Sequence, residues 1–250
     1  MVARQRCGVK NINKILIGFD KKISQFKRFE VSTTAKQALS SQEYSLPKTK
    51  VGYLRVNALT VNDQVREKLE GFKNNNITTL VLDLRACQSL NAISGSAKFL
   101  TYWLGKNSLD LFLLKAQKKK SFEEDGDVVW HEKVIVLIDR DTQGNFEQIA
   151  AELQMLDNVV LAGTPTSGNG NINSFKQLVE DGVSDFFLLK PHSDLCARGE
   201  RINGRPIQPD VALEVPVAVL GTSEESRSRA IAFLSELLEK TEAVQKGMSH

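Results

Sequence analysis

The stretch KVGYLRVNALTVNDQVREKLEGFKNNNITTLVLDLR, residues 50–85, decides the fold class of this chain. Its two ends, KVGYLRVN and TTLVLDL, are apolar and rich in β-branched residues, which is typical of buried strands. Between them, apolar residues recur at helical spacing: Val61, Val65, Leu69 and Phe72. This pattern predicts an amphipathic helix that ends at the asparagine run of residues 74–76. A strand, a helix and a strand in this order indicate an α/β architecture.

The same alternation continues along the chain. Further strands are expected at residues 109–114, 133–139 and 158–163. Two more helices are expected on the apolar stripes Ile93, Ala97, Leu100, Leu104 and Phe146, Ile149, Ala150, Leu153, Leu156. The pairs Asp125–Gly126 and Asp181–Gly182 predict the turns of two hairpins.

The two ends of the chain are read from weaker patterns. Residues 13–19 and 26–34 are compatible with strands, whereas residues 35–47 (AKQALSSQEYSLP) are expected to be a connection. Near the other end, Thr222 and Glu225 have the spacing of a capping box. The stripe that follows predicts a last helix packed on the core: Ile231, Leu234 and Leu238.

Composition excludes several classes of protein. The 250 residues are 41% hydrophobic and 25% charged, as in ordinary globular proteins. Lysine and arginine exceed aspartate and glutamate by only 33 to 30, so nucleic-acid binding is not expected. Cys7, Cys87 and Cys196 are scattered and are expected to be free thiols rather than disulfide or zinc ligands. We expect no cofactor, no metal, no transmembrane segment and no export signal in this sequence.

Four segments resemble, in order, the catalytic core of the tail-specific (carboxyl-terminal processing) serine proteases. Residues 50–85 resemble the GYIRI strand, the helix and the LVLDLR strand of that family, and residues 134–154 resemble its TASASE stretch and the helix that follows. Residues 159–173 resemble its VVGxxTxGKGxVQ motif, and residues 204–216 resemble its GxGIxPDxxV motif. The resemblance implies an α/β fold of the ClpP/crotonase type, with mixed sheets, packed helices and added β-hairpins.

The resemblance also assigns the catalytic positions. The family cleaves peptide bonds with a serine that a neutral lysine activates. When Glu147 is set on the closing glutamate of TASASE, Gly144 falls at the serine, and when Gly168 and Gly170 are set on GKG, Asn169 falls at the lysine. Glycine has no attacking oxygen, and the asparagine amide is not a base. The resemblance therefore predicts a member without its Ser-Lys pair.

Supporting positions depart from the family pattern as well. The glutamine that orients the lysine in many members corresponds to Asn173. The NNPGG turn, which supplies an oxyanion-stabilising N–H, corresponds to ACQSL at residues 86–90, and both of its glycines are lost. The oxyanion-loop positions are Ala86, Cys87, Gln88 and Ser89. Residues that would still border a peptide groove are Thr142, Gln143, Ser167, Gly168 and Gly170.

These observations favour a non-catalytic homologue, or pseudoprotease, that binds a peptide or a protein, for example as a scaffold or as a regulator of an active relative. Three parts are expected: residues 1–46, an N-terminal segment that is a linker or the remnant of a PDZ domain; 47–221, the protease-like core; and 222–250, a C-terminal helix and tail. The family implies a periplasmic, lumenal or extracellular location, and the oligomeric state stays open.

Alternatives remain open at this point. Cys87 could serve as a rearranged nucleophile with His131 or His192 as its base, and the hydroxyls of Thr142 and Ser167 flank the lost site. A small-molecule or lipid binder is a third class. Asp83 and Arg85 are either site residues or a structural ion pair at the end of a buried strand. The motif SGNGN, residues 167–171, is read as a tight turn rather than a phosphate cradle, because it lacks phosphate-loop spacing.

Overall fold

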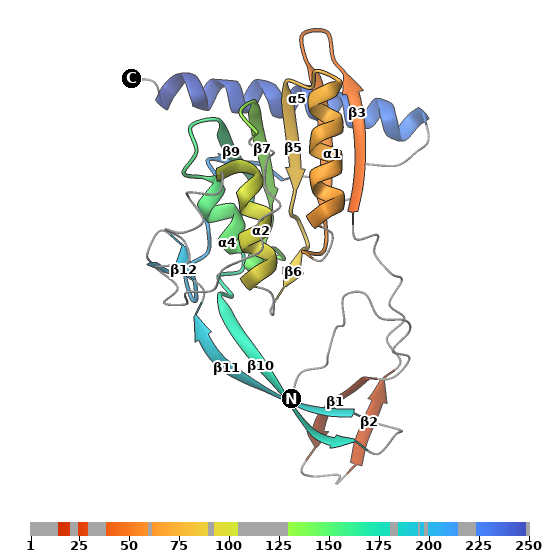
Figure 1. Cartoon of the computed structure of the whole chain (residues 1–250), viewed down its shortest axis with the longest axis vertical. Coiled ribbons are helices and arrows are strands. Elements are labelled where there is room, and N and C mark those ends of the chain that lie inside the picture. Colours follow the sequence, from red (N-terminus) through yellow and green to blue (C-terminus); the bar gives the residue numbers. More distant parts are fainter. Residues whose placement is uncertain are drawn as a thin grey trace.

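The fold is built on one six-stranded mixed sheet (Figure 1). The computed structural model describes residues 15–20, 25–29, 39–59, 62–89, 93–104, 130–180, 185–194, 196–197, 200–214 and 224–248. The order of the strands in the sheet is β14 (Val211–Ala212), β9 (Val159–Gly163), β7 (Lys133–Ile138), β5 (Thr79–Asp83), β4 (Lys50–Val56) and β3 (Leu39–Ser45). The first five run parallel to one another, and β3 is antiparallel to β4.

Helices cover both faces of this sheet. On one face lie α1 (Asn62–Asn74), α2 (Ile93–Leu104) and α4 (Asn145–Leu153), and on the other lies α5 (Glu224–Met248), which crosses the strands (Figure 1). The side chains of α1, α2 and α4 join Leu54, Leu80 and Val136 in one apolar cluster. Leu234, Leu237 and Leu238 of α5 pack in the other. Because both faces are covered, the central strands are apolar throughout, as the sequence predicts for parallel strands.

Four two-stranded pairings lie outside the main sheet in the described residues. β1 (Ile15–Asp20) pairs with β2 (Gln25–Phe29), β10 (Asn171–Glu180) with β11 (Asp185–Asp194), and β12 (Cys196–Ala197) with β13 (Glu200–Arg201), all antiparallel. The fourth pair is parallel and joins β6 (Gln88–Ser89) to β8 (Gln143–Gly144).

Most of the expected elements are present. The helices predicted around Val65, Leu100 and Ile149 are α1, α2 and α4, and α1 ends at Asn74 within the asparagine run. The hairpin predicted around Asp181–Gly182 is present as β10 and β11, although its turn lies outside the described residues. The strand expected at residues 109–114 and the turn at Asp125–Gly126 also lie outside them.

One prediction was wrong. Residues 39–45 are not part of a connection, because they form β3 at the edge of the main sheet. This strand buries only Leu39 and Tyr44, and an edge strand needs few apolar residues since it pairs on one side alone. The division of the chain at residue 47 stays a prediction, although β3 shows that the sheet takes in residues before it.

Two features of the described residues concern membranes and metal ions. Within the described ranges, no helix combines the length and the apolar character that crossing a membrane requires. The same ranges hold no cluster of three or more His, Cys, Asp or Glu side chains that could bind a metal ion.

Candidate functional site

The candidate site lies at the edge of the sheet where the parallel strands end. Three segments follow neighbouring strands there: residues 84–89 after β5, 139–144 after β7 and 164–170 after β9. Carboxyl ends of parallel strands share one edge, which is where α/β proteins place their sites. The pairing of β6 with β8 sets Gln88 opposite Gln143 and Ser89 opposite Gly144. The first two segments are therefore directly joined.

Gly144 occupies the turn from β8 into α4. It is the N-cap residue of the helix, with φ 65° and ψ −126°, a backbone conformation that side chains disfavour. Its N–H donates to the Glu147 carboxylate at 3.0 Å. At this position a residue with a side chain would stand on a sharp strand-to-helix turn, which is the setting in which many hydrolases hold a nucleophile.

Residues 164–170 are fastened to the same turn. The Glu147 carboxylate accepts hydrogen bonds from the Thr166 hydroxyl and the Gly168 N–H, both at 2.6 Å. The side-chain amide of Asn169 donates to Oε1 of Gln143 at 3.3 Å. The structure thus brings Asn169 beside the residue that precedes Gly144. From the sequence, Glu147 only set the alignment. In the structure this buried residue is the joint, because its carboxylate links the turn at Gly144 to residues 164–170.

Backbone conformation and close contacts explain why two residues of SGNGN are glycines. Gly168 has φ 71°, in the left-handed region. A Cβ on Gly170 would lie 2.7 Å from the Asn203 nitrogen and 2.8 Å from Cβ of Ile202. The N–H of Gly168 is already bound to the carboxylate of Glu147, which would repel a phosphate. These contacts support the reading of this motif as a tight turn.

The oxyanion-loop positions keep a left-handed turn without glycine. Ala86 has φ 52°, and its N–H donates to Oδ1 of Asp139 at 2.9 Å. The carbonyl oxygen of Cys87 accepts the N–H of Gln143 at 2.9 Å. The N–H of Ala86 is therefore engaged by a carboxylate. The side chains of Gln88, Ser89 and Asn173 lie outside the described part of the structure.

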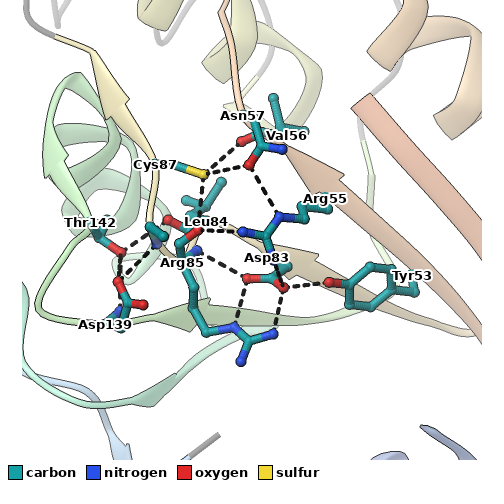
Figure 2. A network of polar contacts seen from close by, with 11 residues as sticks. Tyr53, Arg55, Val56, Asn57, Asp83, Leu84, Arg85, Cys87, Asp139 and Thr142 are labelled. Carbon is teal, nitrogen blue, oxygen red and sulfur yellow. Dashed lines mark hydrogen bonds and ion pairs between the residues drawn. The ribbon is translucent and has the colours of Figure 1, made fainter. Parts of the chain in front are cut away.

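Cys87 is buried among oxygen atoms and is 1% exposed. Its Sγ lies 3.0 Å from the carbonyl oxygen of Val56, 3.3 Å from Oδ1 of Asn57 and 3.3 Å from the carbonyl oxygen of Arg85 (Figure 2). These surrounding oxygen atoms favour the thiol, which can donate a hydrogen bond to them, and disfavour the thiolate, which is the nucleophilic form. These contacts and this burial fit a structural cysteine better than an activated one.

One of the two histidines proposed as its base, His131, lies far from it. His131 is exposed and comes just before β7, at the edge of the sheet where the parallel strands begin. Cys87 follows β5 at the opposite edge, and five residues of strand separate the edges by about 16 Å. His192 lies in β11, whose side chains are outside the described residues.

A buried network of charges lies beneath the loop (Figure 2). The carboxylate of Asp83 accepts Nε of Arg85 at 2.8 Å and Nη2 of Arg85 at 2.7 Å, in a bidentate pair. It also accepts Nη1 of Arg55 at 3.3 Å, the hydroxyl of Tyr53 and the backbone N–H of Arg85 at 3.0 Å. Asp83 is fully buried, and the side chains of Arg85 and Arg55 are 3% and 17% exposed. Asp83 and Arg85 thus pair with each other, the structural alternative that the sequence left open.

The network fixes protonation states. Burial raises the pKa of Asp83, but the hydrogen bonds and charge of Arg85, with the charge of Arg55, outweigh burial and hold that pKa below its ordinary value. Burial and then the charge of Asp83 raise the pKa of Tyr53 far above its ordinary value. Nη2 of Arg55 donates to the carbonyl oxygen of Arg85 at 3.1 Å. The ionised network therefore holds the backbone from which the oxyanion loop departs.

Comparisons with known proteins agree with this architecture. The model of peptidase family S41 matches residues 50–213. The fold is that of the S41 tail-specific proteases. The chain belongs to peptidase family S41.

Individual relatives cover different shares of the chain. Carboxyl-terminal-processing peptidase 2, chloroplastic, of Arabidopsis thaliana is 27% identical over 133 residues, which are 52% of this chain and 26% of that protein. The photosystem II D1 C-terminal processing protease has a TM-score of 0.58 and 16% identity, over 87% of this chain and 59% of its own. An S41 protease of Bacteroides fragilis NCTC 9343 has a TM-score of 0.59 and 17% identity, over 90% of this chain and 67% of its own. The chain thus spans about a quarter of the curated relative.

Proposed function

We propose that this chain is a non-catalytic member of family S41 that binds a peptide or a segment of another protein. The observation that carries the proposal is the pair of residues at the site. Glycine stands at position 144, on the turn into α4, and asparagine at position 169, beside Gln143. The sequence alignment assigns these positions to the serine and the lysine of the family.

The geometry supports the alignment. A serine and the lysine that activates it must lie within hydrogen-bonding reach. Gly144 and Asn169 were assigned from two separate motifs, and Asn169 contacts the residue next to Gly144. Loss of nucleophile and base together lowers turnover by a factor on the order of 10⁶ in subtilisin, a different enzyme. A domain with glycine and asparagine at these positions would have no useful peptidase activity.

The neighbouring hydroxyls do not replace the serine. The Thr142 hydroxyl donates to the carbonyl oxygen of Leu84 at 3.0 Å and lies 3.2 Å from the Asp139 carboxylate. The Ser167 hydroxyl lies 3.4 Å from the carbonyl oxygen of Thr142. Neither contact involves a lysine or histidine that could take the hydroxyl proton. Both side chains fit structural roles in the loops.

Binding does not need the lost groups. The three loop segments remain fastened by Glu147, by the β6–β8 pair and by the Asp83 network. A peptide bound among these loops would be held by hydrogen bonds of its main chain and by pockets for its side chains, and neither needs a nucleophile. The partner could be a substrate-like peptide, or a protein such as an active S41 relative that this domain regulates. A compartment outside the cytoplasm, as in the chloroplastic relative, is part of the same proposal.

The first test restores the catalytic pair. The double variant Gly144→Ser/Asn169→Lys is assayed for cleavage of unstructured protein substrates, next to wild type and the matched Gly144→Ala/Asn169→Lys variant. A side chain at φ 65° and ψ −126° costs about 1–3 kcal/mol, so circular dichroism must show that each variant folds. We expect cleavage above background only with serine. Equal cleavage by the alanine variant would contradict the assignment of Gly144.

The second test addresses binding by wild type. Thermal unfolding is measured with a library of unstructured peptides and with a set of apolar small molecules, because ligands of the native state raise its apparent stability. The proposal predicts stabilisation by peptides. Stabilisation by apolar ligands alone would point instead to a small-molecule or lipid binder.

A further inference from the structure

The outer edge of the main sheet is a regular strand. β3 pairs with β4 over seven residues without a bulge, and the described residues place no strand on its other side. Natural edge strands are commonly protected by lysine, proline, a bulge or a cover, because an open edge pairs readily with another chain. The sequence LSSQEYS, residues 39–45, contains neither lysine nor proline. Its one charged side chain, Glu43, accepts a hydrogen bond from the side-chain amide of Asn75 at 2.8 Å.

The turn that joins β3 to β4 fixes which backbone groups face outward. Leu46 and Thr49 exchange two backbone hydrogen bonds, at 2.9 Å and 3.4 Å, so they form a hydrogen-bonded pair. Such pairs alternate with non-hydrogen-bonded pairs along an antiparallel ladder, so the even-numbered residues of β3 bond to β4. The odd-numbered ones turn their N–H and C=O groups to the open edge: Leu39, Ser41, Glu43 and Ser45. The contact of Glu43 agrees with this, because its carbonyl oxygen accepts Nη2 of Arg227 at 3.3 Å.

A second copy of this chain continues the sheet best in one register. In a twofold pairing, the strand of the second copy runs antiparallel to β3. Centred on Gln42, this pairing uses the whole strand and sets Ser41 opposite Glu43 of the second copy, so outward backbone groups meet outward backbone groups. The carbonyl oxygen of Glu43 has a second lone pair for this bond. Centred on Glu43, the pairing would oppose two carboxylates directly, which is unfavourable.

Helix α5 favours the same register. Arg227 lies near its start, with Cζ 5.3 Å from the centroid of the Tyr44 ring, so α5 crosses β3 near residues 43–44 and its first turns extend past the edge (Figure 1). In the register centred on Gln42 the two α5 helices cross the joined strands three residues apart, which is about 10 Å. Packed helices lie about 8–10 Å apart. The registers centred on the residue before or after Gln42 would set the helices about 17 Å or about 3 Å apart.

The start of α5 carries both signs of charge. Glu225, Arg227 and Arg229 are exposed, and Glu225 and Arg229 pair within the helix at 2.6 Å. Two such helix starts that lie antiparallel offer each other both carboxylate and guanidinium groups. The contact therefore brings no patch of a single sign against itself.

We propose that this chain forms a homodimer in which β3 pairs with β3 of a second copy, centred on Gln42, and the starts of the two α5 helices pack beside the joined strands. The twofold axis closes the contact, so assembly through it stops at two chains. The dimer uses none of the residues of the candidate site, so this inference goes beyond the proposed function and does not rest on it.

Mass against concentration tests the dimer. Size-exclusion chromatography with light scattering is recorded from about 1 µM to about 1 mM, and we expect the wild-type mass to rise twofold across this range. Ser41→Pro should keep the monomer mass, because it removes an N–H at the open edge without breaking a bond to β4. The matched Ser41→Ala should dimerise like wild type, and circular dichroism shows that both variants fold. A wild-type chain that stays monomeric at about 1 mM, or dimerisation of Ser41→Pro equal to that of Ser41→Ala, would overturn the inference.

A cysteine at the centre of the strand tests the register. Directly opposed residues of a non-hydrogen-bonded pair have Cα atoms about 4.5 Å apart, within the range of a disulfide. Gln42→Cys should therefore form a covalent dimer under mild oxidation, seen on a non-reducing gel beside wild type. Ser40→Cys, on the same face but about 13 Å along the strand from its copy, should not. Cross-linking of Ser40→Cys as strong as that of Gln42→Cys, or of neither, would overturn the pairing of β3 with its copy.

Discussion

Replacement of Asp83 by asparagine tests what the buried network contributes to stability. The substitution keeps the size of the side chain but removes the charge that faces two arginines. Arg85 is 3% exposed and Arg55 is 17% exposed, so neither guanidinium can be fully hydrated in the folded protein. Removing one partner of a buried ion pair costs about 3–5 kcal/mol. Native proteins have about 5–15 kcal/mol of stability, so the loss would be a large fraction of the total.

Urea denaturation measures this loss. Trp103 and Trp130 are 3% and 2% exposed, and their fluorescence reports unfolding of the face that α2 covers. The midpoint should fall in Asp83→Asn with little change in the slope of free energy against urea. Asp63→Asn is the matched control, because Asp63 forms its ion pair with Lys98 at 74% exposure and should matter far less.

A double substitution checks the cause. In Asp83→Leu/Arg85→Met the buried charge and its main partner are removed together. The double variant should therefore lose less stability than the sum of the losses in the two single variants. A loss below about 1 kcal/mol for Asp83→Asn, or strictly additive effects in the double variant, would refute the account of the network.

Three further predictions follow from the same contacts. The free energy of unfolding should fall below about pH 4, because the pKa of Asp83 is depressed in the folded state and its contribution is lost on protonation. It should also fall above about pH 10, because the raised pKa of Tyr53 keeps the hydroxyl protonated in the folded state while it ionises in the unfolded state. Urea titrations at each pH measure both limbs; Asp83→Asn should flatten the acid limb and Tyr53→Phe the alkaline one, and unchanged limbs would count against the network. Ala86→Gly should stabilise the fold by up to about 1 kcal/mol, since alanine at φ 52° is strained, and a loss of stability would contradict this. Glu147→Gln should cost about 2–3 kcal/mol, because an amide presents one acceptor to the donors of Gly144, Thr166 and Gly168, and a change under 0.5 kcal/mol would show that Glu147 is not the joint.

The sequence predicts the parts of the fold whose burial is regular. β4, β5, β7 and β9 are apolar because helices cover both faces, and α1, α2 and α4 show their stripes for the same reason. β3 was not predicted, because an edge strand can be mostly polar. Its formation depends on the pairing with β4, which its own residues do not reveal. The two-residue pairing of β6 with β8 leaves no pattern in the sequence, since it depends on loops that meet only after folding.

The candidate site is partly predictable in the same sense. Two separate motifs assign Gly144 and Asn169, and the structure places the segments that carry them in contact. The left-handed conformation of Ala86 was not predicted from the sequence. The expectation that the lost glycines alter the oxyanion loop stays a prediction, because residue 90 and the side chain of Ser89 lie outside the described part of the structure. The joint role of Glu147 is visible only in three dimensions.

The most direct measurement is a cleavage assay on wild-type protein and its Cys87→Ala variant with unstructured protein substrates. The account predicts that neither protein cleaves above the level of a mock purification and that a fluorophosphonate probe labels no residue. Cleavage that co-purifies with the wild-type chain, and that Cys87→Ala or another single substitution at this site abolishes, would contradict the central claim.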